Sequence, residues 1–195
     1  MAVGLILLST VIVSLAGLWL APAVIERSVF RPYWFLRERQ YWSAVGSVLV
    51  HGSLPHLLLN SLTLASFGFP LERAIGSLRF AALYVVGVAV SDAGTWLRHR
   101  ADPQYACLGA SGAVLAVLFA AIVYFPRQSI LILPLPVPIP APLFAVCYLL
   151  VSAIAARRAR GRINHGAHVD GALAGWLFVA LTDPRAWERA LRLLW

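Results

Sequence analysis

The sequence predicts an all-α membrane protein, a bundle of six membrane-spanning helices. Of its 195 residues, 61% are hydrophobic and only 12% are charged, whereas soluble domains carry less apolar and about twice as much charged sequence. Six segments also approach the ~20 apolar residues that cross a bilayer as a helix. We therefore expect one domain over residues 1–195, with its core at about 3–182 and a short polar C-terminal tail at 183–195.

The first three spans follow from their apolar runs. The first covers about Val3–Ala21. No Lys or Arg precedes it and it exceeds the ~7–15 residues of a signal-peptide core, so we expect it to be retained. The connection Arg27–Trp42 is rich in aromatic residues and Arg, which is typical of the lipid headgroup zone. The second span is predicted at about Leu54–Leu71 and the third at about Phe80–Leu97.

Two unlike connections separate the last three spans. The polar loop Arg98–Tyr105 leads to the fourth span, at about Ser111–Tyr124. Five prolines then alternate with apolar residues over positions 134–142, and repeated proline predicts a stiff, extended connector. The fifth span is expected at about Leu143–Ala156 and the sixth at about His168–Leu181.

Small residues recur four apart in the fourth and sixth spans. They are Gly112, Ala116 and Ala120 in the fourth, and Gly171 and Gly175 in the sixth. Such spacing lets two helix backbones approach closely in lipid. We therefore expect these two helices to pack together and to bring Ser111 into contact with His168, although the same residues could also simply tighten the bundle.

The charge of the chain points to lipid. All 16 basic residues are arginines, and the net charge is +8. Because the arginines are dispersed between apolar blocks, anionic lipid headgroups suit them better than nucleic acid does. The two cysteines, Cys107 and Cys147, establish no disulfide framework.

Ser111 is the candidate nucleophile, at the predicted start of the fourth span within Gly109-Ala110-Ser111-Gly112. Glycines let the backbone turn tightly, and a helix N-terminus offers unpaired N–H groups to an oxyanion. The tetrapeptide alone is a weak signal. A nucleophilic serine also needs a base, and His168, which is predicted to open the sixth span, can take the serine proton as a neutral imidazole.

Further polar residues lie at the start of the second span. His56 and Asn60 are four apart and share one helix face, so both can donate hydrogen bonds toward one point, as an oxyanion hole requires. His51 lies at the entrance of this span. The alternative is a polar cluster that satisfies itself between helices. Asp170 lies nearly opposite His168 on its helix, so we do not expect it to orient that histidine, and Asp92 has no partner predicted from sequence.

Three motifs, in one order along the chain, together resemble the rhomboid family of intramembrane serine proteases over about residues 3–182. They are His51-x4-His56-x3-Asn60, then Gly109-Ala110-Ser111-Gly112, then Ala167-His168-x2-Gly171-x3-Gly175. Residues 68–84, with Leu71-Glu72, Gly76-Ser77 and Tyr84, are also similar to the family.

The resemblance implies a six-helix bundle that hydrolyses peptide bonds of membrane-spanning proteins near the bilayer surface. Ser111 would be the nucleophile and His168 the general base and acid. His56, Asn60 and the Ser111 backbone N–H would form the oxyanion hole. The supporting residues would be His51, Gly109, Gly112, Gly171 and Gly175. The resemblance implies no metal or other cofactor, and it implies transmembrane protein substrates and membrane lipids, not nucleic acid, as partners. The expected location is a bacterial-type plasma (inner) membrane, with several spans.

Two positions depart from the family pattern. Many members have Trp-Arg in the first loop, where this chain has Trp42-Ser43, and some have an aromatic residue stacked on the histidine four residues after the serine, where this chain has Leu115. These departures concern the anchoring of the loop and the packing of the histidine, not the serine and histidine themselves.

The arginines disagree with the family's orientation, in which the N-terminus is cytoplasmic and the site faces outward. The site side carries ten arginines and the other side six, so the positive-inside rule favours the reverse. The two sets are Arg27, Arg31, Arg37, Arg39, Arg98, Arg100, Arg157, Arg158, Arg160 and Arg162, and Arg73, Arg79, Arg127, Arg185, Arg189 and Arg192. We keep the family orientation, because the resemblance extends along the whole chain. The run Arg157–Arg162 is either a gate that meets headgroups or an anchoring loop.

Other functions remain open. A rhomboid-like pseudoprotease would bind client transmembrane helices without cleavage, but it would be expected to lack Ser111 or His168, and both are present. His51, His56, His165 and His168 raise the possibility of a metal-binding transporter or metalloprotease, although no His-Glu-x-x-His spacing supports it. A specialised branch that processes sorting signals at protein C-termini also fits the motifs.

Overall fold

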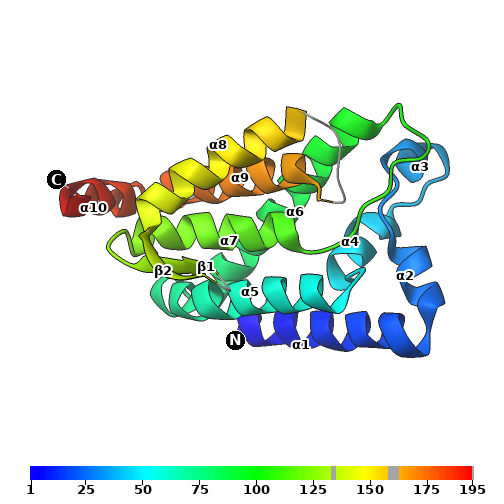
Figure 1. Cartoon of the computed structure of the whole chain (residues 1–195), viewed down its shortest axis with the longest axis horizontal. Helices are drawn as coiled ribbons and strands as arrows, with labels where there is room; N and C mark the ends of the chain where they lie inside the picture. Colours follow the sequence, from blue (N-terminus) through cyan, green and yellow to red (C-terminus); the bar gives the residue numbers. More distant parts are fainter. Residues whose placement is uncertain (133–134, 158–162, 195) are drawn as a thin grey trace.

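A central helix, α7 (Ser111–Tyr124), organises the fold (Figure 1). The computed structural model describes residues 1–132, 135–157 and 163–194. Every residue of α7 from Gly112 to Val123 is buried, because α5, α6 and α9 pack around it. The other elements are α1 (Ala2–Leu15), its π-helical continuation η1 (Ala16–Leu20), α2 (Pro22–Ser28), α3 (Pro32–Arg37), α4 (Trp42–Leu49), α5 (Leu54–Ile75), α6 (Ser77–His99), β1 (Ser129–Ile132), β2 (Leu135–Pro140), α8 (Ala141–Arg157), α9 (His165–Thr182) and α10 (Pro184–Leu194).

All six predicted spans are helical, as α1 with η1, α5, α6, α7, α8 and α9. Among the described helices, residues 2–20 and 77–99 are long and apolar enough to cross a bilayer by length and composition. The pair α4–α5, bent by 87°, adds a third if it counts as one span. Leu78, Val85, Leu150 and Leu177 are among the large apolar side chains exposed on α6, α8 and α9. Their exposure suits lipid contact and confirms a helical membrane fold.

Two connections contain regular structure that the sequence did not predict. The aromatic and basic stretch 27–42 contributes to the short helices α2, α3 and α4. The proline-rich connector is extended, as predicted, but β1 and β2 pair as an antiparallel hairpin with Ser129 opposite Pro140 and Ile130 opposite Ile139. A two-stranded hairpin tolerates proline because each strand has one unpaired edge, where a missing backbone N–H breaks no hydrogen bond of the sheet. Pro134 lies outside the described residues.

The polar tail predicted at 183–195 contains an amphipathic helix, α10, over residues 184–194, which was not predicted from the sequence. Ala186 and Ala190, four residues apart, are buried on its inner face, and the helix contacts α7 and α9. Because this segment contains several arginines, its overall composition is polar and does not reveal the apolar residues that line one face of the helix.

Glu72 joins three helices at the end of the bundle opposite Ser111. Its buried carboxylate accepts hydrogen bonds from the backbone N–H of Ala2 at 2.5 Å, from that of Val3 at 3.2 Å and from the Ser77 hydroxyl at 2.5 Å. These contacts satisfy N–H groups that α1 cannot satisfy by itself. Glu72 therefore ties the start of α1 to the turn between α5 and α6.

Candidate active site

Ser111 and His168 meet where α7 and α9 begin. The Ser111 Oγ lies 2.9 Å from His168 Nε2, and both side chains are partly buried. His168 was predicted to open its helix, but it is the fourth residue of α9. α9 begins at His165, because the Asn164 side chain accepts a hydrogen bond from the Ala167 N–H at 3.0 Å and so caps the helix. His168 therefore lies in a capped first turn.

The predicted close packing of α7 and α9 is present and has a clear cause. A Cβ atom on Gly171 would lie 2.0 Å from the carbonyl oxygen of Gly112, and one on Gly175 would lie 2.1 Å from that of Ala116. A real Cβ atom essentially never approaches within 3.0 Å. Only glycine therefore lets the two backbones touch, and this contact brings Ser111 to His168.

Gly109 shapes the turn into α7. Its φ of +111° is a conformation that residues with a side chain rarely adopt. Its N–H donates to the Ser47 carbonyl at 2.8 Å, and a Cβ atom there would lie 2.6 Å from the imidazole of His56. Gly109 is therefore required both for the turn and for the approach of His56 to the backbone that precedes Ser111.

A chain of hydrogen bonds links α1 to Asn60 through the fully buried His51. Asn60 Nδ2 lies 3.0 Å from His51 Nε2, His51 Nδ1 lies 3.1 Å from Ser14 Oγ, and the Ser14 hydroxyl donates to the Leu49 carbonyl at 3.1 Å. An amide donor from Asn60 makes Nε2 the acceptor, so the His51 proton is on Nδ1 and points to Ser14. This chain orients the Asn60 amide and leaves it one further N–H.

The residues predicted for one site are thus gathered at the start of α7. Asn60 and Ala110 line the same small cavity, and His56 lies against Gly109. The sequence did not indicate that Ser14 contacts His51, because a single serine in the apolar first span belongs to no recognisable motif. Within residues 1–132, 135–157 and 163–194, no group of three or more His, Cys, Asp or Glu side chains could hold a metal ion.

Tyr148, on α8, is a second contact of His168 that the sequence did not indicate. Its hydroxyl lies 2.9 Å from His168 Nδ1, and the two rings are inclined by 24° with centroids 6.4 Å apart. This tyrosine stacks on the histidine, whereas Leu115 is buried on α7. The missing aromatic residue at position 115 was the available clue, but nothing in the sequence identified its replacement.

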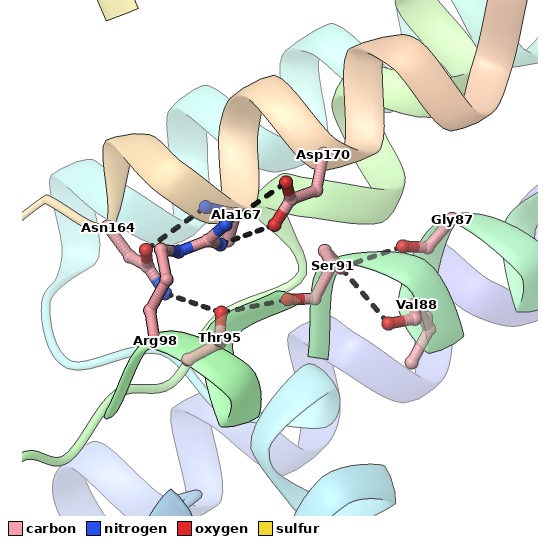
Figure 2. A network of polar contacts seen from close by, with 8 residues as sticks. All are labelled: Gly87, Val88, Ser91, Thr95, Arg98, Asn164, Ala167 and Asp170. Atoms are coloured by element: carbon pink, nitrogen blue, oxygen red, sulfur yellow. Dashed lines mark hydrogen bonds and ion pairs between the residues drawn. The ribbon is translucent and has the colours of Figure 1, made fainter. Parts of the chain in front are cut away.

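Asp170 does not contact His168, in agreement with its expected place on the other helix face. It forms an ion pair with Arg98 of α6 (Figure 2). Beside this pair, Asn164 donates to the Thr95 hydroxyl at 2.9 Å, so the same two helices are joined twice. Cβ atoms on Gly94 and Gly166 would overlap Asp170 and Arg98 respectively, so these two glycines make room for the pair. The joined helices hold the first turn of α9 in place.

Asp92, Ser43 and the run Arg157–Arg162 were also singled out in the sequence. Asp92 Oδ2 is buried without a hydrogen-bond partner among the described residues. Ser43, at the position where many family members have Arg, is buried and donates to the Gln40 carbonyl at 2.6 Å. Residues 158–162, which include most of the predicted arginine gate, lie outside the described residues.

The apolar helices and their packing define a helical integral membrane protein. Residues 38–185 match the family described as the Rhomboid domain, so the chain belongs to the rhomboid family. It is 28% identical to the putative rhomboid protease YdcA of Bacillus subtilis (strain 168) over 71% of this chain and 65% of that protein.

Two mitochondrial proteins are also similar. The chain is 30% identical to Rhomboid protein 1, mitochondrial, of Saccharomyces cerevisiae over 85% of this chain and 49% of that protein. It is 29% identical to the human Presenilin-associated rhomboid-like protein, mitochondrial, over 73% of this chain and 38% of that protein. The chain thus spans between 38% and 65% of the length of these relatives.

Proposed function

We propose that this chain is an intramembrane serine endopeptidase that hydrolyses peptide bonds in or near the transmembrane segments of membrane proteins. One observation carries the proposal, namely the 2.9 Å contact between Ser111 Oγ and His168 Nε2 within a bundle of membrane helices. A serine activated by a neighbouring histidine is the usual arrangement for attack on a peptide carbonyl. Membership of the rhomboid family adds support to this proposal. The proposed location is a bacterial-type plasma membrane.

In this mechanism His168 Nε2 takes the Ser111 proton while Oγ bonds to the carbonyl carbon of the substrate. The negative charge moves to the carbonyl oxygen, where the Ser111 backbone N–H, His56 and Asn60 would donate hydrogen bonds. His168 then protonates the leaving amine as the peptide C–N bond breaks. A water molecule, deprotonated by His168, finally hydrolyses the acyl ester of Ser111 and restores the free serine.

The surroundings support these roles. Ser111 is the first residue of α7, so its N–H has no partner within the helix and is available to an oxyanion. The Asn60 amide is oriented through His51 and keeps one N–H for the substrate. A substrate peptide bond is accessible only where its own helix unwinds, so helix-breaking small residues near the cleavage point favour the reaction.

The test compares the wild type with Ser111→Ala in proteoliposomes that contain a single-span substrate. Ser129→Ala, at an exposed position of β1, is the matched control. We expect cleavage by the wild type and the control, and none by Ser111→Ala. Cleavage by Ser111→Ala would reject the mechanism. Without cleavage by any of the three, labelling of Ser111 by a fluorophosphonate would indicate a protease of narrow specificity, and its absence would favour a client-binding pseudoprotease.

A further inference from the structure

Both ring nitrogens of His168 have a partner. Nε2 faces Ser111 Oγ at 2.9 Å, and Nδ1 faces the Tyr148 hydroxyl at 2.9 Å. The three side chains come from three different helices, α7, α9 and α8. The imidazole is therefore held between the candidate nucleophile and a phenol, and the phenol occupies the place where a serine hydrolase with a triad has its third residue.

The protonation required by the mechanism determines what the phenol does. To take the Ser111 proton, His168 Nε2 must be the free nitrogen, so the ring proton is on Nδ1. Nδ1–H then donates to the Tyr148 oxygen, and the hydroxyl proton of Tyr148 needs another acceptor. Ser152 is buried one turn further along α8, and its hydroxyl oxygen can accept this proton. Ser152 can thus keep the Tyr148 oxygen free to accept from His168.

Aromatic neighbours hold Tyr148 in this position. Phe144, one turn earlier on α8, stacks on it with centroids 5.4 Å apart and planes inclined by 27°. Phe119 of α7 also packs against the Tyr148 ring, with centroids 6.0 Å apart and planes inclined by 58°. A phenol fixed by packing acts as a preorganised hydrogen-bond partner, since little side-chain freedom is lost when the bond forms.

We propose that Tyr148 is a positioning residue of the Ser111–His168 pair. It accepts the Nδ1–H bond, keeps Nε2 directed at Ser111 and stabilises the charged imidazole that forms when the serine proton moves. Tyr148 keeps its own proton throughout, because the transferred proton passes from Ser111 Oγ to Nε2 and on to the leaving amine. This role rests on the proposed protease function.

A structural role would account for the same contacts, because buried tyrosines usually have a hydrogen-bond partner. The two roles differ in what Tyr148→Phe changes, since this substitution keeps the ring and removes only the hydroxyl. Tyr124→Phe is the matched control. Tyr124 is the last residue of α7, far from Ser111, and its hydroxyl donates a 2.9 Å hydrogen bond to Asp183, which follows α9.

The experiment measures kcat, KM and the rate of fluorophosphonate labelling of Ser111 in proteoliposomes. For Tyr148→Phe we expect kcat and the labelling rate to fall about 10- to 100-fold, the loss typical of a hydrogen bond to a charged group, with KM unchanged. Because that bond favours the charged imidazole, its loss also moves the acid limb of the kcat–pH profile to lower pH. Tyr124→Phe keeps kcat and the pH profile, whatever its melting temperature.

Equal losses of kcat in the two variants, or a kcat of Tyr148→Phe within twofold of the wild type, would overturn the positioning role. If Tyr148→Phe does not fold, Ser152→Ala tests the same chain of hydrogen bonds, and full kcat and an unmoved pH profile there would also overturn it. A wild type that is neither active nor labelled would instead reject the proposed protease function, and the role of Tyr148 with it.

Discussion

The contact of Gly171 with Gly112 allows a quantitative prediction for Gly171→Ala. A methyl group at this position would lie 2.0 Å from the Gly112 carbonyl oxygen, 2.7 Å from the carbonyl carbon and 3.0 Å from the Cα atom. All three are backbone atoms, which no side-chain rotation can move aside. The substitution must therefore push α9 away from α7.

The displacement follows from these distances. Raising the closest contact from 2.0 Å to the 3.0 Å limit requires a shift of about 1 Å. Because Ser111 directly precedes Gly112, such a shift would stretch its 2.9 Å contact with His168 beyond hydrogen-bond length. Overpacking costs about 1–3 kcal/mol of folding stability, against which alanine gains about 0.5–1 kcal/mol over glycine in a helix. A misplacement of about 1 Å costs roughly 100-fold in rate.

Gly4→Ala, in α1, is the control, because a Cβ atom there meets nothing within 4 Å. Thermal unfolding in detergent and fluorophosphonate labelling of Ser111 are measured for both variants. We expect a lower melting temperature and about 100-fold slower labelling for Gly171→Ala, and an unchanged or higher melting temperature with normal labelling for Gly4→Ala. A Gly171→Ala protein that unfolds and labels like the wild type would show that α7 and α9 are not in backbone contact.

Three further predictions concern other contacts. Glu72→Gln is expected to lower the unfolding free energy by about 1–3 kcal/mol, since the carboxylate accepts two hydrogen bonds from the start of α1 and one from Ser77 at the start of α6. An unchanged melting temperature would contradict this. Burial, together with the charge of the nearby Asp92, raises the pKa of Cys107 to about 12. In a Cys147→Ser background the thiol should therefore react with iodoacetamide at pH 8 about a thousandfold more slowly in the native than in the unfolded protein, and equal rates would disprove it. Burial raises the pKa of Asp183, but the hydrogen bond from Tyr124 and the Arg189 charge outweigh it and hold the pKa below its ordinary value. Its contribution to stability is thus present at neutral pH and lost as the pH falls through the lowered pKa, so Asp183→Asn should show a smaller loss of stability between pH 6 and pH 3 than the wild type.

Much of the helical arrangement was predictable, because lipid demands long apolar segments and close helix contacts demand small residues. The residues at which helices and strands begin and end were less predictable. The start of α9 depends on the Asn164 cap, and α10 depends on the burial of Ala186 and Ala190 against other helices. The pairing of β1 with β2 likewise depends on contacts that proline spacing does not reveal.

Motifs identified Ser111, His168, His56 and Asn60 as candidates, because a nucleophile, a base and hydrogen-bond donors are costly at membrane depth and stand out among apolar residues. Tyr148 did not stand out, since an aromatic residue in an apolar helix is ordinary. Its relevance arises only when α8 packs beside α9 and directs the hydroxyl at His168 Nδ1.

The sequence by itself thus determined the membrane class, the helical segments and the chemistry available at the start of the fourth span. These follow from composition, spacing and residue type, which are local properties. Only the tertiary structure decided which groups share a hydrogen bond. Ser14 with His51, Asp170 with Arg98 and Tyr148 with His168 are far apart in sequence or lie on different helices. Their pairing depends on helix rotation and on approaches of a few ångströms, which are set by the packing of the whole bundle.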